Sequence, residues 1–143
     1  MGKFNTTLKS TAALAVARLL SLPETSPTRP SLSDYANGFC YVSSFLTSQK
    51  EILEAVQRVT GTTDADWRIE TLDADAYIEE GKAKLARGEL AGMVNVLGGM
   101  LFKGGMGGDY ESVRGTSNAV LGLPQESLDG AVREIVAKMG RSF

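Results

Sequence analysis

The sequence predicts a mixed α/β or α+β fold with about two strands and five helices. Five stretches place apolar residues at helical spacing, and two short segments, 39–45 and 67–72, have the aromatic and β-branched content typical of strands. A chain of 143 residues with 43% hydrophobic and 22% charged residues suits a single domain with one core. We therefore treat residues 1–143 as one region.

The first half is predicted to run helix, loop, strand, helix. The helix over about 7–22 ends at Pro23, because the residue before a proline is pushed out of the α region. Its apolar face consists of Leu8, Ala12, Ala15, Val16, Leu19 and Leu20. The segment 23–38 contains three prolines and shows no periodicity, which indicates a loop. After the strand 39–45, Ser48 and Glu51 have the spacing of a capping box that begins the next helix.

The second half is predicted to contain a strand over 67–72 and three helices. The strand prediction rests on alternation of apolar and charged residues, and Asp73 is suited to cap the helix that follows. That helix has the inner face Tyr77, Ile78, Gly81 and Leu85. The helix over 90–101 has the inner face Leu90, Met93, Val94, Leu97 and Leu101. Its three glycines each cost roughly 1 kcal/mol relative to alanine, so it needs tertiary support or close packing that only glycine permits. The last helix runs from Pro124 to about Met139.

Composition excludes several classes of function. The chain has no His, which removes His-based metal sites and Ser-His-Asp or Cys-His catalysis. A net charge of −2 argues against a nucleic-acid partner, and no apolar run approaches the ~20 residues of a membrane span. The single cysteine fits a reducing compartment, and we expect a cytoplasmic protein. Residues 12–20 are predicted to form an amphipathic helix rather than a signal peptide.

The segment 102–118 is a glycine-rich loop and the first candidate site. It lacks the spacing of both G-x-G-x-x-G and the P-loop, so we predict no cofactor-binding residues in it and no metal site in the chain. A mobile loop beside a pocket and a flexible connector both remain open as interpretations. Tyr110 and Lys103 are the candidate proton-transfer residues. The candidate substrate-binding residues are Phe102, Met106, Gly107, Gly108, Asp109 and Tyr77.

Two further features have structural explanations. The acidic residues between Asp64 and Glu80 do not match an EF-hand, and helix capping with a solvated face accounts for them. Cys40 has an aromatic neighbour on each side, and no His is present to activate it, so we expect an inert thiol.

Four stretches carry a resemblance to a known family. They are residues 6–8 with 13–24; Tyr-Val-Ser-Ser-Phe at 41–45 with 48–53 and 59–61; Met-Gly-Gly-Asp-Tyr at 106–110; and Leu-Gly-Leu-Pro at 121–124. In this order the chain resembles the C-terminal part of fungal NmrA-like, isoflavone-reductase-like proteins, which are atypical short-chain dehydrogenases/reductases. The resemblance implies the substrate-domain portion of a Rossmann protein, with the N-terminal Rossmann half absent.

That resemblance implies NADP(H) as the family's cofactor, held by the absent half, with none bound by this chain alone. Three hypotheses follow. The first is a truncated oxidoreductase of secondary metabolism. The second is a cofactor-free isomerase or cyclase that uses Tyr110 or Lys103 as proton donor. The third is a non-catalytic regulatory binding protein. The expected partners are a small hydrophobic metabolite and either a second copy of the chain or a full-length reductase.

Overall fold

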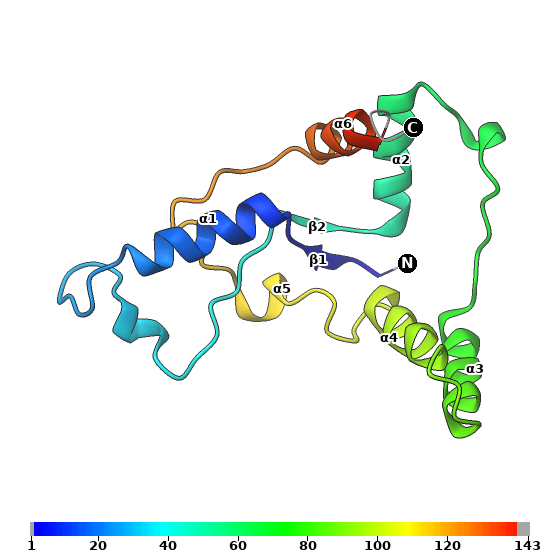
Figure 1. Cartoon of the computed structure of the whole chain (residues 1–143), viewed down its shortest axis with the longest axis horizontal. Coiled ribbons are helices and arrows are strands. Elements are labelled where there is room, and N and C mark those ends of the chain that lie inside the picture. Colours follow the sequence, from blue (N-terminus) through cyan, green and yellow to red (C-terminus); the bar gives the residue numbers. More distant parts are fainter. Residues whose placement is uncertain (1, 140–143) are drawn as a thin grey trace. The chain divides into compact units, whose positions relative to one another are not determined.

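A computed structural model describes residues 2–139 (Figure 1). Two short strands, β1 and β2, pair in a two-stranded sheet, and helices make up most of the regular structure, which confirms the mixed fold class. In chain order the elements are β1 (Phe4–Thr6), α1 (Lys9–Leu20), a 3-10 turn (Leu32–Tyr35), β2 (Phe45–Thr47), α2 (Gln49–Thr60), a second 3-10 turn (Asp64–Asp66), α3 (Ala74–Ala86), α4 (Gly92–Phe102), α5 (Glu111–Arg114) and α6 (Leu128–Met139). The five predicted helices correspond to α1, α2, α3, α4 and α6, while α5 adds one turn inside the predicted loop 102–118.

The positions of the strands differ from the prediction. Segment 67–72 is irregular, and all of its residues are exposed, with Trp67 at 41% and Leu72 at 63%. An alternating pattern makes a strand only when a neighbouring strand completes its hydrogen bonds, and this segment has no such neighbour among the described residues. Of the predicted strand 39–45, only Phe45 belongs to β2. The strand that pairs with β2 is β1, whose three residues are too few to show a period.

The chain divides into two compact units. Unit 1 comprises the N-terminal segment up to Phe4, residues 47–109, and the segment from Ser127 onward. Unit 2 comprises residues 5–46 and 110–126. The division falls within both strands, and the chain passes between the units at four places.

In unit 1, α3 and α4 pack through glycines (Figure 1). A Cβ added at Gly92 would lie 2.3 Å from the Gly81 carbonyl oxygen, and one at Gly99 would lie 2.5 Å from Ile78 Cγ1. Of the inner face predicted for α3, Ile78 and Gly81 are buried, Tyr77 is half-buried and Leu85 is exposed, so the prediction is correct in part. The expected close packing through glycine in α4 is confirmed, because no side chain fits between the two backbones.

The apolar face predicted to point inward on α4 is instead exposed. Leu90 is 76% exposed, Val94 69% and Leu97 60%. Gly92 and Gly99 lie on the opposite side of the helix and take the place next to α3, so the predicted apolar face has no partner among the described residues. The prediction was wrong because it took the most hydrophobic side of the helix as its inner face. The side of α4 that packs against α3 is instead the one whose residues are small enough for the two backbones to approach closely.

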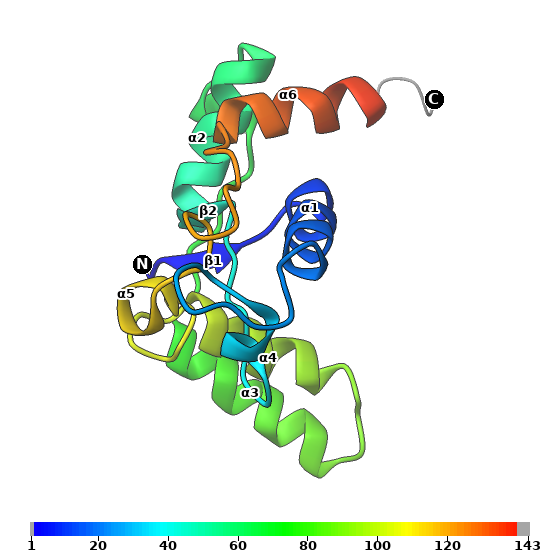
Figure 2. The same cartoon turned by 90° about the vertical axis from the view of Figure 1, so that its left-hand side faces the viewer.

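Unit 1 also contains the pair α2 and α6, which lie side by side in both views (Figure 2). Ala55 of α2 and Val132 of α6 are buried. Arg58 donates two hydrogen bonds to the Asp129 carboxylate, with N–O distances of 3.0 and 2.6 Å. This two-pronged contact fixes the pairing geometry, and the Asp129 hydrogen bond raises the pKa of Arg58.

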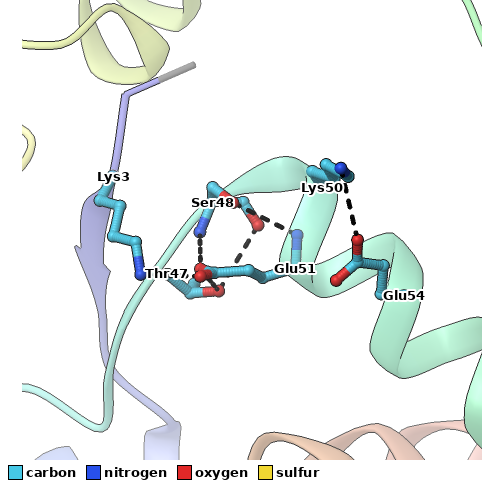
Figure 3. Close-up of polar contacts among 6 residues, drawn as sticks. All are labelled: Lys3, Thr47, Ser48, Lys50, Glu51 and Glu54. Carbon is cyan, nitrogen blue, oxygen red and sulfur yellow. Dashed lines mark hydrogen bonds and ion pairs between the residues drawn. The ribbon is translucent and has the colours of Figure 1, made fainter.

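The predicted capping box begins α2 (Figure 3). The Ser48 hydroxyl accepts from the Glu51 N–H at 3.3 Å, and the Glu51 carboxylate accepts from the Ser48 N–H at 2.9 Å. Lys3 Nζ lies 2.7 Å from the same carboxylate. The hydrogen bond from Lys3, followed by that from the Ser48 N–H, lowers the pKa of Glu51.

This arrangement predicts a loss of stability in acid. Because the pKa of Glu51 is lower in the folded chain than in the unfolded chain, its contribution is complete above its ordinary pKa and is lost as pH falls through the lowered value. We expect Glu51→Gln to reduce the decrease in melting temperature between about pH 7 and about pH 3. Glu54→Gln, which removes the exposed partner of Lys50 one turn along α2, is the matched control. An acid transition that is identical in both variants would contradict this assignment.

Candidate functional site

The candidate site is an aromatic cluster around Tyr110 in unit 2. The ring centroid of Tyr110 lies 5.3 Å from that of Tyr41. The ring centroid of Phe39, two residues before Tyr41 in the chain, lies 5.9 Å from that of Tyr41. The guanidinium carbon of Arg114 lies 5.7 Å from the Tyr41 ring centroid, within the range of a cation–π contact. Phe39 is 82% exposed, so the cluster opens to solvent.

A polar network holds the segments that carry these rings. Asn118 accepts a hydrogen bond from the Ser43 N–H at 3.1 Å and donates one to the Ser43 carbonyl at 2.6 Å. The Ser117 N–H donates to the Tyr41 carbonyl at 2.7 Å. Two residues that follow α5 thus provide the hydrogen-bond partners of the Tyr41 carbonyl and of both backbone groups of Ser43.

A second set of hydrogen bonds fixes the start of α5. The Glu111 N–H donates to Asn5 Oδ1 at 3.0 Å, and Asn5 Nδ2 donates to the Glu111 carboxylate at 2.8 Å and to the Ser43 hydroxyl at 2.9 Å. Thr11, which is buried, donates to the Glu126 carboxylate and accepts from the Ser44 hydroxyl. Tyr110 and Arg114 therefore stand on a supported turn rather than on a free loop.

The chemistry of this cluster suits recognition of a flat ring. Three aromatic side chains offer faces and edges for stacking, and Arg114 supplies a positive charge at their margin. The Tyr110 hydroxyl donates to the Val42 carbonyl at 2.5 Å. Because this proton is already engaged, Tyr110 would give it to a ligand only by releasing Val42.

Lys103, the other predicted proton donor, belongs to unit 1. It forms an ion pair with Asp75 of α3. The structure therefore assigns Tyr110 and Lys103 to different units, each with a partner of its own. Their predicted catalytic roles remain predictions.

The predicted substrate-binding residues also lie in unit 1. The Phe102 ring packs edge-on against Phe4, with centroids 5.0 Å apart. A Cβ at Gly108 would meet the Leu101 carbonyl oxygen at 2.6 Å, so Gly108 is needed for packing. Gly107 has a φ of +91° with open space around it, and Met106 is 44% exposed. Half-buried Tyr77 lies near Gly98, and Asp109 precedes Tyr110 at the division between the units.

The glycine-rich run does not fit an NADP(H) pyrophosphate. Residues 104–108 follow the C-terminus of α4, where a helix presents carbonyl groups and partial negative charge. Phosphates bind where a helix begins and N–H groups point outward. The run at 104–108 leads only to the four-residue α5, so it offers no such end to a nucleotide.

Sequence reasoning found Tyr110 but missed Phe39, Tyr41 and Arg114. Phe39 and Tyr41 were assigned to a buried strand, whereas they lie in an irregular segment in which Phe39 is exposed and Tyr41 is half-buried. The signal that was available is their i, i+2 spacing, which places two rings on one side of an extended chain. Nothing local indicated that this side faces Tyr110, which lies far along the sequence.

Three other features of the described residues complete the survey. Residues 2–139 contain no group of three or more His, Cys, Asp or Glu side chains that could hold a metal ion. In the same range, each helix falls short of the length and hydrophobicity needed to cross a membrane. Unit 2 has an open hollow of ≈ 330 Å³ lined by Arg18, Ser21, Leu22, Ala119, Val120, Leu121 and Gly122.

Comparison with known proteins relates the chain to fungal oxidoreductases. It is 25% identical over 134 residues to oxidoreductase aprR of Aspergillus flavus, covering 94% of this chain and 41% of that protein. It is 32% identical over 109 residues to oxidoreductase poxI of Penicillium oxalicum, covering 73% of this chain and 32% of that protein. The chain thus spans well under half the length of these relatives. No family model and no solved structure matches it.

Proposed function

We propose that this chain supplies the substrate-binding part of an NADP-dependent, isoflavone-reductase-like oxidoreductase of fungal secondary metabolism. Its relation to aprR and poxI, both named oxidoreductases, supports the reaction class. The resemblance to NmrA-like proteins supports NADP(H) as the cofactor. It also supports a protein in which one part binds the cofactor and another part, represented by this chain, binds the substrate. Because the glycine-rich run does not fit the pyrophosphate of the cofactor, the role we propose for this chain is to recognise the substrate. We place this function in the cytoplasm.

The observation that carries the proposal is the Tyr41–Tyr110–Arg114 cluster. A flat, largely apolar metabolite would stack on the rings, and an acidic group on it would lie against Arg114. The Tyr110 hydroxyl, bound to the Val42 carbonyl, keeps its ring in a fixed orientation. The chain's residues thus bind and orient the ligand.

Calorimetric titration with cinnamate and its neutral amide tests this function. We expect cinnamate to bind and Arg114→Gln to weaken it roughly fivefold, since an exposed charge contact contributes about 1 kcal/mol. The amide should bind weakly and equally to both proteins. Tyr41→Leu should weaken both ligands, because it removes the central ring. Arg29→Gln, on an exposed loop of the same unit, is the matched control.

NADPH is the second ligand in this experiment. We expect no affinity better than about millimolar, since no helix N-terminus follows the glycines. Micromolar affinity for NADPH would overturn the proposed division of labour. Cinnamate affinity unchanged by both Arg114→Gln and Tyr41→Leu would remove the cluster as the site. Conversion of a ligand by the chain without NADPH would favour the isomerase or cyclase instead.

A further inference from the structure

The strongest unexplained feature of unit 1 is the α4 apolar face, which we define as Met93, Val94, Leu97, Met100 and Leu101 of the helix together with Leu90 in the turn just before it. These side chains are between 36% and 76% exposed. They recur every three or four residues, so they form one stripe along the helix, on the side opposite Gly92 and Gly99. No residue from Gly92 to Phe102 is charged. An exposed apolar stripe of this length marks an interaction surface.

Charge at the two ends of the stripe identifies its occupant. Glu89 lies just before the α4 apolar face and Lys103 just after it. Glu89 accepts from Arg87 at 2.6 Å, and Lys103 pairs with Asp75, so each end already has a local partner and spare hydrogen-bonding capacity. When a second stripe runs antiparallel to the first, the Arg87–Glu89 pair of one copy lies against the Lys103–Asp75 pair of the other, so each charged group gains a second neighbour of opposite sign.

We propose that the α4 apolar face binds the same face of a second copy of this chain, with the two α4 helices antiparallel about a two-fold axis. The axis passes midway between the levels of Val96 and Leu97, which places Glu89 within one residue of the position opposite Lys103. Glu89 of each copy then meets Lys103 of the other, and Met93 lies opposite Met100. The contact is isologous and closes on itself, which limits assembly to a dimer.

Sedimentation velocity over about 5 to 500 µM tests the dimer. A single helix face is smaller than the ~800 Å² per partner of a standard interface, so we expect a reversible dimer with micromolar affinity. Leu97→Glu should weaken it at least about tenfold, because it places two carboxylates in the apolar centre. Val16→Glu on α1, exposed to 56% against 60% for Leu97, is the matched control and should leave the affinity unchanged. Circular dichroism melts of both variants establish that they fold.

Disulfide cross-linking in a Cys40→Ser background tests the antiparallel arrangement. Met93→Cys and Met100→Cys proteins should cross-link when mixed, since these positions face each other across the axis. Each protein alone should cross-link poorly, because its two equivalent positions lie beyond the ~7 Å Cα separation of a disulfide. A wild-type chain that stays monomeric at all concentrations overturns the proposal. So does a dimer that Leu97→Glu and Val16→Glu affect equally, or one whose cross-links form only between identical positions.

Discussion

Gly92→Ala is expected to lower the free energy of unfolding of unit 1 by about 2 kcal/mol, because the new Cβ has no room beside α3. It would lie 2.3 Å from the Gly81 carbonyl oxygen, 2.8 Å from Lys84 Cβ and 3.0 Å from the Leu85 nitrogen. Two of these atoms belong to the α3 backbone and cannot rotate away. The two helices must therefore separate, and the contact between Gly99 and Ile78 loosens with them.

Gly98→Ala is the matched control for this prediction. Gly98 also lies within α4, but a Cβ there would meet its nearest neighbours, Phe102 and Tyr77, only at 4.0 Å. Alanine should therefore stabilise the chain by about 0.5–1 kcal/mol through its higher helix propensity. Urea denaturation of both variants gives the comparison. A stabilising effect of Gly92→Ala would show that α3 and α4 do not pack this closely.

Asn118→Ala is expected to reduce the stability of unit 2 by about 2–3 kcal/mol. The change removes both hydrogen bonds to Ser43, one to its N–H and one to its carbonyl. Ser43 is only 4% exposed, so water cannot replace the lost partners freely. The segment that contains Tyr41 would also lose its support, and cinnamate binding should weaken with it.

Asn37→Gly is the control for the asparagine change. Asn37 lies exposed in a turn with φ of +56°, a conformation that glycine adopts without strain. Its replacement should change the free energy of unfolding by less than about 0.5 kcal/mol. Chemical denaturation followed by tyrosine fluorescence measures both variants. Equal effects at positions 37 and 118 would contradict the structural role of Asn118.

Features that depend on neighbouring residues could be predicted from the sequence. The capping box of Ser48 and Glu51 was found because both partners lie within one helical turn. Gly61 closes α2 in the left-handed conformation, which a glycine directly after a helix commonly adopts. The five longer helices were found for the same reason, since their period is visible within each segment.

Features that depend on residues far apart in the sequence could not be predicted from it. The alternation at 67–72 carries no information about a missing partner strand, and β1 is too short to show alternation. The sequence of α4 offers two sides that could pack against α3, one with large apolar side chains and one with Gly92 and Gly99, and it does not show which of them does so. Tyr110 was selected as one of few proton donors, but its neighbour Tyr41 is brought to it by Asn118, which the sequence did not distinguish from any other loop residue.

The way the chain passes between its units has a consequence for synthesis on the ribosome. The α3–α4 hairpin is made from adjacent sequence and forms as soon as α4 has left the exit tunnel. The pair α2 and α6 must wait, because Arg58 meets Asp129 only after 70 intervening residues have been made. Unit 2 likewise needs Asn118 and Glu126 before the hydrogen bonds of Ser43 and Thr11 are complete. Until translation nears its end, the α3–α4 hairpin is therefore the one completed part of the nascent chain described here, and its α4 apolar face is exposed. Exposed apolar surface of this kind on an incompletely folded chain is what chaperones bind.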